Sequence, residues 1–357
     1  MSAPSSSLAS SASSDASPVS AADGAPRISV VIPLYNKEGQ IARALDSVFA
    51  QSFQDFEVVV IDDGSKDRGP EIVAAIADPR VRLHRQANAG VSVARNRAVE
   101  LARADVIAFL DGDDAWYPDH LERLWQLRAD YPGTVAWAMN YHVVDLAGRL
   151  TPGVSVVTEP RLVLTPENYF RIARHGTPVF SSAVAVDKAA LQRVGGFPAG
   201  VRLGEDLDTW IRLLFSGPIA FDARPGAYYH ADGDDRALVR NPPPPRYVFF
   251  DTDEAWMRAH PEATQVAQDI EAFHDFFRLA HAHHQIKWGD KAAGRAVLKD
   301  CRSRAFAAER DRLKRLSLLP QPLYRALGRV QATLRRRAEA PSASTSSPSS
   351  TTQASRG

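Results

Sequence analysis

The chain has 357 residues, of which 45% are apolar, and its formal net charge is +1. This length allows one large domain with an appendage, or two domains, and there are enough apolar side chains for a sizeable core. The near-neutral charge gives no case for a nucleic-acid-binding protein, and the single cysteine, Cys301, excludes a disulfide within the chain. We therefore expect a cytoplasmic protein, and no apolar run approaches the roughly 18 residues of a transmembrane helix.

The two ends of the chain differ in composition from the rest. Residues 1–26 and 338–357 are rich in Ser, Ala and Pro, and such segments bury too little apolar surface to fold. The N-terminal segment also lacks the basic start and the apolar stretch of a secretory signal peptide. We expect two disordered tails, a folded domain over residues 27–240 and, after a run of four prolines, a helical extension over residues 246–337.

The first part of the folded region alternates between apolar runs and helical patterns. Strands are predicted at residues 28–33, 56–61, 81–84 and 106–110, and helices at residues 38–50, 69–77 and 91–102. The strand segments are rich in β-branched residues and lack polar alternation. Such segments indicate a mostly parallel sheet with helices on both faces, so the predicted fold class is α/β.

The second part is less regular. Strands are predicted at residues 134–144 and 181–186, helices at residues 116–129, 188–194 and 206–216, and a loop-rich stretch at residues 145–165. Beyond the prolines, the pattern over residues 251–336 is wholly helical.

Polar and acidic residues follow three of the predicted strands, in the segments Pro33-Leu34-Tyr35-Asn36, Asp62-Asp63-Gly64-Ser65 and Asp111-Gly112-Asp113-Asp114. In open α/β sheets the ligand binds outside the carboxyl ends of the strands. We therefore expect these three segments to converge on one binding site.

Three carboxylates, Asp111, Asp113 and Asp114, are crowded at the end of one apolar strand. Their mutual repulsion is relieved by a cation, and Mg²⁺ or Mn²⁺ is the usual choice because it prefers oxygen ligands and bridges carboxylates to phosphate. Helix capping is the alternative, but three acids exceed what a cap needs. The pattern predicts a metal-bound diphosphate and leaves open which of the three contact the metal directly.

The remaining candidate residues each fit two roles. Asp62 and Asp63 fit a turn or the recognition of a nucleoside, and Glu205 and Asp206 fit a helix start or a general base. Arg95 fits a phosphate contact or a solvated helix face. His230, by itself, fits a metal ligand or a structural residue.

Three features of the C-terminal region also suggest roles. Of His281, His283 and His284, only the first and last share a helix face and no carboxylate completes a set, so we expect a solvated face and no metal site. Cys301 is expected to be a small buried residue. The segment from Arg302 to Arg337 interleaves many basic residues with leucines, which fits an exposed helix pair or contact with an anionic membrane surface.

Five motifs, in order along residues 27–230, resemble those of the family-2 glycosyltransferases. They are Ser29-Val30-Val31-Ile32-Pro33-Leu34-Tyr35-Asn36, Ile61-Asp62-Asp63-Gly64-Ser65, Asn88-Ala89-Gly90 with Ala94-Arg95-Asn96, Phe109-Leu110-Asp111-Gly112-Asp113-Asp114, and Gly195-Gly196-Phe197 followed by Gly204-Glu205-Asp206-Leu207-Asp208. The resemblance implies a GT-A fold, a nucleotide-sugar donor, most often a UDP-sugar, and inversion at the anomeric carbon.

The resemblance also implies roles for particular residues. Asp206 matches the catalytic base, and the metal ligands would come from Asp111, Asp113, Asp114 and, less reliably, His230. The nucleotide-sugar would contact Pro33, Tyr35, Asn36, Glu38, Asp62, Asp63, Asn88, Arg95, Asp111, Gly112 and Glu205.

The expected activity is sugar transfer to a saccharide or lipid-linked acceptor in cell-surface glycan assembly, in the cytoplasm or at the inner membrane face. The Gln-x-x-Arg-Trp motif of processive synthases is absent, which favours transfer of single sugars. The alternatives are a nucleotidyltransferase, which would be expected to carry a glycine-rich, basic loop after the first strand, and a non-catalytic nucleotide-sugar-binding scaffold.

Overall fold

The computed structural model describes residues 24–231 and 242–324, which form two compact units. The first unit contains residues 24–231 and 247–267, and the second contains residues 242–246 and 268–324. The predicted tails, apart from residues 24–26, and the last part of the predicted helical extension lie outside the described residues.

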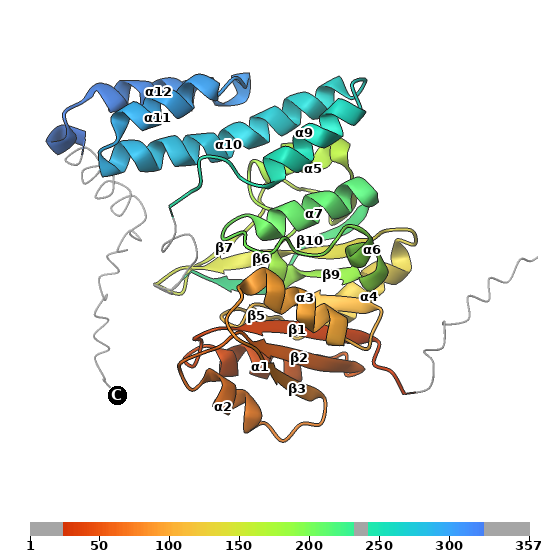
Figure 1. The fold of residues 1–357 in the computed structure, drawn as a ribbon. Helices are drawn as coiled ribbons and strands as arrows, with labels where there is room; N and C mark the ends of the chain where they lie inside the picture. The colour runs from red at the N-terminus through yellow and green to blue at the C-terminus, as the bar shows by residue number, and fades with distance from the viewer. Residues whose placement is uncertain (1–23, 232–241, 325–357) are drawn as a thin grey trace, which may run out of the picture. The chain divides into compact units, whose positions relative to one another are not determined.

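The N-terminal half of the first unit has the predicted alternation of strands and helices (Figure 1). Its four strands are parallel and stand in the order β3-β2-β1-β4. They are β1 (Ile28–Leu34), β2 (Phe56–Asp62), β3 (Val81–Arg85) and β4 (Val106–Phe109), connected by α1 (Ile41–Phe49), α2 (Gly69–Ala74) and α3 (Val91–Leu101). Every residue of β2 is buried, as the continuous apolar run predicts for a strand covered on both faces.

The sheet continues into a mixed second half in the order β9-β6-β10-β5. Here β9 runs antiparallel to both β4 and β6, whereas β6 and β10 are parallel. The elements are β5 (Ala115–Trp116), α4 (His120–Asp130), β6 (Ala136–Val144), β7 (Leu150–Pro152), β8 (Arg161–Leu164), α5 (Pro166–Ala173), η1 (Ser181–Ala183), β9 (Val184–Asp187), α6 (Lys188–Arg193), α7 (Glu205–Ser216) and β10 (Ile219–His230). The α/β class is confirmed, and the N-terminal half of the sheet is wholly parallel.

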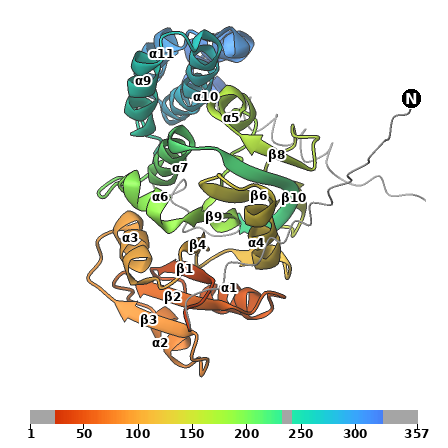
Figure 2. The same ribbon diagram turned by 90° about the vertical axis from the view of Figure 1, so that its right-hand side faces the viewer.

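Helices cover both faces of this sheet, with α1 and α4 on one side and α3, α6 and α7 on the other (Figure 2). On the second side, Phe109 of β4 packs against Phe197 and against Trp210 of α7, with ring centroids 5.3 and 5.7 Å apart. Trp210 is fully buried. These contacts fix the start of α7 near the end of β4.

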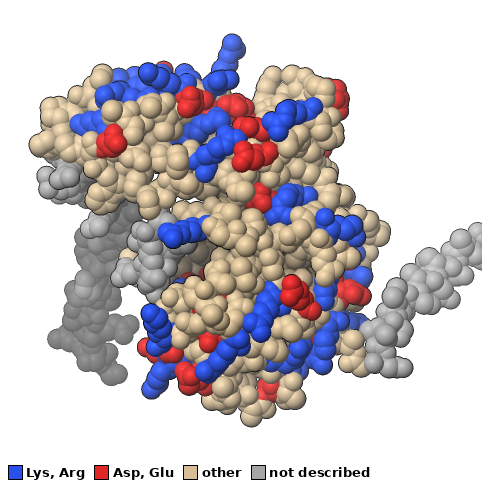
Figure 3. All heavy atoms as spheres, in the orientation of Figure 1, with Lys and Arg blue, Asp and Glu red and all other residues tan. Residues whose placement is uncertain are grey.

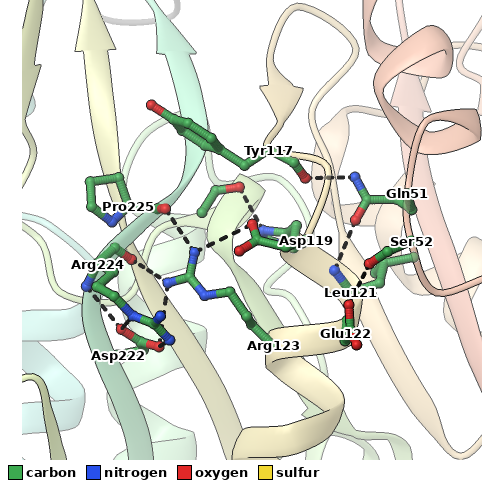
Figure 4. A network of polar contacts seen from close by, with 12 residues as sticks. Gln51, Ser52, Tyr117, Asp119, Leu121, Glu122, Arg123, Asp222, Arg224 and Pro225 are labelled. Atoms are coloured by element: carbon green, nitrogen blue, oxygen red, sulfur yellow. Dashed lines mark hydrogen bonds and ion pairs between the residues drawn. The ribbon is translucent and has the colours of Figure 1, made fainter.

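Strand β10 was missed in the sequence, and its centre explains why. The segment Asp222 to Gly226 contains a proline and a glycine, and its pairing with β6 shifts register twice, as in a β-bulge. Figure 4 shows the contacts that hold the bulge: Arg123 of α4 donates to the carbonyls of Pro225 (2.9 Å) and Arg224 (2.8 Å) and lies 3.3 Å from the Asp222 carboxylate. Because β10 runs parallel to β6, its end, with His230, lies opposite Val144 at the carboxyl edge of the sheet.

One further helix of the first unit, α9 (Phe249–Ala259), packs beside α7. Gly204, the residue before α7, has φ +83°, and a Cβ there would lie 2.8 Å from a ring atom of Tyr247. The close approach of this aromatic segment therefore requires glycine at the start of α7.

The second unit is helical, as predicted over its described part. It contains the part of α10 (Thr264–Trp288) from Gln268 onward, α11 (Lys291–Asp300), η2 (Arg304–Phe306) and α12 (Ala307–Leu318). Its core includes Leu279, Ile286, Leu298, Leu313 and, as predicted, buried Cys301. Within residues 24–231 and 242–324, no helix combines the length and the apolar character of a membrane span.

The expectation of a solvated histidine face in this unit is wrong for His281. Its side chain is buried, and Nδ1 lies 2.6 Å from the carbonyl oxygen of Pro243. A chain segment from before α10 returns over this position, which local helical spacing does not reveal. His283, by contrast, is exposed.

Candidate active site at the carboxyl edge of the sheet

The parallel register brings the predicted strand-end residues to one edge of the sheet. Leu34 at the end of β1 pairs with Asp62 at the end of β2, and the amide of Leu110 after β4 donates to the carbonyl of Val31 (3.0 Å). The acidic residues after β2 and β4 therefore flank the end of β1. This arrangement follows from parallel pairing, in which carboxyl ends meet at the same edge.

Asp62 and Asp63, which we call the β2 acidic pair, are buried and accept hydrogen bonds from the chain itself. The Asp63 carboxylate accepts from the amides of Ala89 (2.9 Å) and Gly90 (2.8 Å) and from the Gln86 side chain (2.7 Å). Asp62 accepts from the amide of Ser65 (2.9 Å). The pair therefore shapes the loop that carries Asn88, next to the start of α3.

The residues after β1 form hydrogen bonds with the loop that follows β2. Asn36, at φ +51°, accepts at its side-chain oxygen from the amide of Lys66 (2.8 Å), and Glu38 accepts from the amide of Arg68 (3.0 Å). Tyr35 is 39% exposed. Pro33 lies beside Gly112, where an added Cβ would be 3.5 Å from the Pro33 carbonyl. Asn36 and Glu38 thus join two loops, and Tyr35 is left accessible.

A second group, which we call the acidic cluster, contains Asp111, Asp113, Asp114, Glu205 and Asp206. Arg95 connects its two halves: one terminal nitrogen of the guanidinium donates to Asp111 (2.7 Å) and the other to Glu205 (3.2 Å). Only 3% of Arg95 is exposed, and its guanidinium carbon lies 5.2 Å from the centre of the Phe197 ring. Arg95 therefore does not lie on a solvated helix face, the alternative considered for it, and is placed between Asp111, which follows β4, and Glu205 of α7; its phosphate contact stays a prediction.

Electrostatics at Arg95 favour the ion pairs strongly. Burial by itself lowers the pKa of Arg95, but the charges of Asp111, Glu205 and Asp206 outweigh it and raise that pKa above its ordinary value. A buried guanidinium of this kind is held by its paired carboxylates. The side chain therefore fixes the distance between the end of β4 and the start of α7.

Asp114 is the most deeply buried member of the cluster, at 1% exposure. It accepts hydrogen bonds from the Ser182 hydroxyl and from the backbone amide of His230 (3.1 Å). Burial first, and then the charges of Asp113 and Asp111, raise the pKa of Asp114 well above its ordinary value. His230 is thus brought to the cluster through its backbone, at the end of β10.

Asp113 and Asp111 each have a carboxylate oxygen that can still bind a ligand. Lys37 donates to Oδ2 of Asp113 (2.5 Å), and Arg95 donates to Oδ1 of Asp111. Within the described residues, no hydrogen bond is recorded to the other oxygen of either carboxylate. No three His, Cys, Asp or Glu side chains of residues 24–231 and 242–324 are grouped to hold a metal. Two carboxylates completed by water and phosphate oxygens nevertheless fit Mg²⁺ or Mn²⁺.

The other two members of the acidic cluster, Glu205 and Asp206, begin α7. Burial first, and then the charge of Asp206, raise the pKa of Glu205 to about 7. The pKa of Asp206 is also raised by burial, against the opposing charge of Arg95. Asp206 remains partly exposed, accepts from the amide of Leu207 (2.7 Å) and lies 3.4 Å from the Ser181 hydroxyl. It is therefore a carboxylate with raised basicity that is partly open to solvent.

Sequence reasoning missed three residues of this site. Lys37 directly follows the strand-end segment of β1 and contacts Asp113. Ser182 contacts Asp114 and accepts from the amide of Asp111 (3.1 Å), and Ser181 lies beside Asp206. Only Lys37 had a sequence signal, because it adjoins a predicted strand end. Ser181 and Ser182 lie in η1, which directly precedes β9, and the antiparallel pairing of β9 with β4 brings them to the site. Local sequence patterns do not indicate this pairing.

Comparison with known proteins identifies the domain that holds this site. Residues 29–194 match the model "Glycosyl transferase family 2". "Succinoglycan biosynthesis protein ExoO" of Rhizobium meliloti (strain 1021) is 41% identical over 148 residues, 41% of this chain and 41% of that protein. "Succinoglycan biosynthesis protein ExoW" of the same strain is 42% identical over 118 residues, 31% of this chain and 37% of that protein. Both matches cover about two fifths of the relative's length.

Solved structures show the same fold. Residues 1–349 of TarS from S. aureus, in complex with UDP-GlcNAc, align with a TM-score of 0.61 and 18% identity over 84% of this chain and 92% of that one. A further crystal structure of S. aureus TarS aligns with a TM-score of 0.56 and 18% identity over 82% of this chain and 54% of that one. The predicted GT-A α/β fold is therefore confirmed, and the domain at residues 29–194 belongs to the family-2 glycosyltransferases.

Proposed function

We propose that this protein is an inverting glycosyltransferase that transfers a sugar from a UDP-sugar to an acceptor hydroxyl with the help of Mg²⁺ or Mn²⁺. The observation that carries the proposal is the buried Arg95, which holds Asp111 beside Glu205 and so places a cation-binding edge next to Asp206. The similar TarS structure in complex with UDP-GlcNAc and the two succinoglycan biosynthesis relatives support the donor and the pathway class.

The β2 acidic pair and the loop residues around it would receive the nucleoside. The loops after β1 and β2 are rigidly joined through Asn36 and Glu38, so the pocket wall is formed before the donor binds. Tyr35 offers an exposed ring beside these loops. Preorganised contacts of this kind lower the entropic cost of binding.

Asp111 and Asp113 would hold the divalent cation, and Asp114 is more deeply buried than either of them. When bound, the cation neutralises the charge that develops on the departing nucleoside diphosphate. Arg95 keeps Asp111 oriented, and Lys37 does the same for Asp113. The backbone amide of His230 orients Asp114. The imidazole of His230 is proposed as an additional ligand of the cation.

Asp206 would act as the general base. Its carboxylate takes the proton of the acceptor hydroxyl while that oxygen bonds to the anomeric carbon. The bond from this carbon to the diphosphate oxygen breaks on the opposite face, and its electron pair leaves with UDP. Attack opposite to the leaving group inverts the anomeric configuration. The raised pKa of Asp206 favours this proton transfer.

The proposed setting is cell-surface glycan assembly with a saccharide or lipid-linked acceptor, in the cytoplasm or at the inner face of the membrane. The succinoglycan relatives support this setting, and Pro33 to Gly39 lacks the glycine-rich, basic loop expected of a nucleotidyltransferase.

The experiment that tests the proposal measures UDP release from a panel of UDP-sugars, beginning with UDP-GlcNAc, in the presence of Mn²⁺ and of a mixture of saccharide and lipid-linked acceptors, because transfer needs an acceptor hydroxyl. We expect Asp206→Asn to bind UDP as the wild type does and to lose turnover by roughly 10²–10⁴-fold. The matched control is Asp105→Asn, because Asp105 is exposed and precedes β4 at the opposite edge of the sheet. A wild type that binds a UDP-sugar without turnover is a scaffold, and full activity in Asp206→Asn would remove the assigned base.

A further inference from the structure

The second unit presents three large apolar side chains at one corner. Trp288 at the end of α10 is 66% exposed, Leu318 at the end of α12 is 74% exposed, and Leu323 is 49% exposed. Single exposed leucines are ordinary. An exposed tryptophan beside two exposed leucines is a feature that needs a partner.

Hydrogen bonds hold the three segments together. The side-chain amide of Gln321 donates to the carbonyl of Lys287 (2.8 Å), and the Lys291 ammonium donates to the carbonyl of Leu319. Tyr324 lies in the core formed by the helices. These bonds bring the segments that carry Trp288, Leu318 and Leu323 to the same end of this unit, which we call the Trp288 corner.

The chain that forms α11 and α12 has an excess of basic residues. Between Lys287 and Tyr324 it carries ten Lys and Arg residues against four Asp and Glu residues. Two of these acids are paired within α12, Glu309 with Arg312 and Asp311 with Lys314. Figure 3 shows Lys and Arg atoms gathered over α12. Lys287, next to Trp288, is exposed, and its ammonium lies 5.5 Å from the Trp288 ring centre.

We propose that the Trp288 corner docks onto an anionic lipid surface. Tryptophan prefers the boundary between headgroups and acyl chains, and leucines add apolar area that inserts there. Lys287 and Arg315 would contact lipid phosphates, because basic side chains are attracted to anionic leaflets within a Debye length. The excess of positive charge is the reason for choosing a membrane over a second copy of the chain, which would bring like charges together.

This docking is independent of the proposed transferase activity, since all of its residues lie in the second unit. It would concentrate the protein at a bilayer surface. A UDP-release assay without vesicles reports on the transferase alone, so the two proposals can fail separately.

The test is co-sedimentation of the full chain with phosphatidylcholine vesicles, with and without phosphatidylglycerol. We expect binding only when the anionic lipid is present, and weaker binding as salt is raised. Leu318→Ser and Arg315→Glu are each expected to lower the partition coefficient by about tenfold, and Trp288→Ala by a similar factor.

Matched controls exist in the first unit. Leu146→Ser removes a leucine that is 83% exposed, and Arg171→Glu reverses a basic residue that, like Arg315, lies in the last turn of its helix. Both are expected to bind vesicles as the wild type does. The proposal is overturned if the wild type ignores anionic vesicles, if the controls lose as much binding, or if light scattering shows a dimer that Leu318→Ser disrupts.

Discussion

Two groups of acidic side chains lie at the same edge of the sheet, and the chain treats them differently. The β2 acidic pair is bonded mainly by backbone amides, such as those of Ala89 and Gly90. The acidic cluster is held by the side-chain cations Arg95 and Lys37 and by the hydroxyl of Ser182. Within this cluster, burial and mutual repulsion raise the pKa values of Asp114, Glu205 and Asp206.

This difference gives the two groups different roles: the β2 acidic pair shapes a loop, and the acidic cluster is suited to bind a cation. Backbone amides are fixed donors, so the β2 acidic pair determines the shape of a loop before any ligand binds. The acidic cluster has more negative charge than its two cations balance, so it favours binding a further cation. The predictions below test this contrast.

The largest expected effect comes from Arg95. Arg95→Met would leave the buried Glu205 and the partly exposed Asp111 without their partner, and the free energy of unfolding should fall by about 3–5 kcal/mol. Arg95→Lys should recover part of this loss, because one ammonium cannot span both carboxylates as the guanidinium does. Urea unfolding measures both variants.

The control for Arg95 is Arg97→Met on the same helix. Arg97 is partly exposed and bonds to Gln86 (3.2 Å), so its loss should cost less than about 1 kcal/mol. Equal destabilisation by the two methionine variants would show that the buried bridge has no special role.

A smaller effect is expected at the β2 acidic pair. Asp63→Ala removes the acceptor of two amides and one side chain, and the free energy of unfolding should fall by about 3 kcal/mol. UDP binding should weaken as well, because the loop loses its shape. Asp46→Ala, an exposed acid on α1, is the control and should remain within about 0.5 kcal/mol of the wild type. A stable Asp63→Ala protein would contradict the architectural role.

The raised pKa values predict an inverse dependence of stability on pH. Burial and the charge of Asp206 raise the pKa of Glu205 from 4.5 to about 7. Between these values the folded chain keeps a proton that the unfolded chain has released, so this contribution to the free energy of unfolding falls as pH rises through the window. Glu205→Gln should remove about 2 kcal/mol of this change between pH 5 and pH 7.

Thermal or urea unfolding across that pH range provides the measurement. Glu100→Gln, an exposed glutamate on α3, should keep the wild-type slope. An identical pH slope in all three proteins would show that Glu205 titrates as an ordinary carboxylate.

The parallel half of the sheet could be predicted from sequence because its information is local. The β-branched runs of β1, β2 and β4 and their polar ends are contiguous in the chain, and parallel pairing brings those ends together. The motif order along residues 27–230 then indicated the family, which the match over residues 29–194 supports.

The remaining parts depend on contacts between distant segments. The bulge in β10 hid a strand, because Pro225 and Gly226 are unfavourable in a regular ladder. Arg95 has the same local pattern whether it faces solvent or bridges β4 and α7, and its partner Glu205 is 110 residues away. Ser182 and the buried position of His281 depend on segments that return from elsewhere in the chain.

The most direct test of the central claim measures UDP binding by calorimetry with Mn²⁺ and with a chelator. If the acidic cluster holds a cation against the diphosphate, Mn²⁺ should tighten UDP binding by about tenfold or more. Asp113→Asn should lose that gain, and Asp105→Asn should retain it. Equal UDP affinity with and without Mn²⁺ in the wild type would contradict the account.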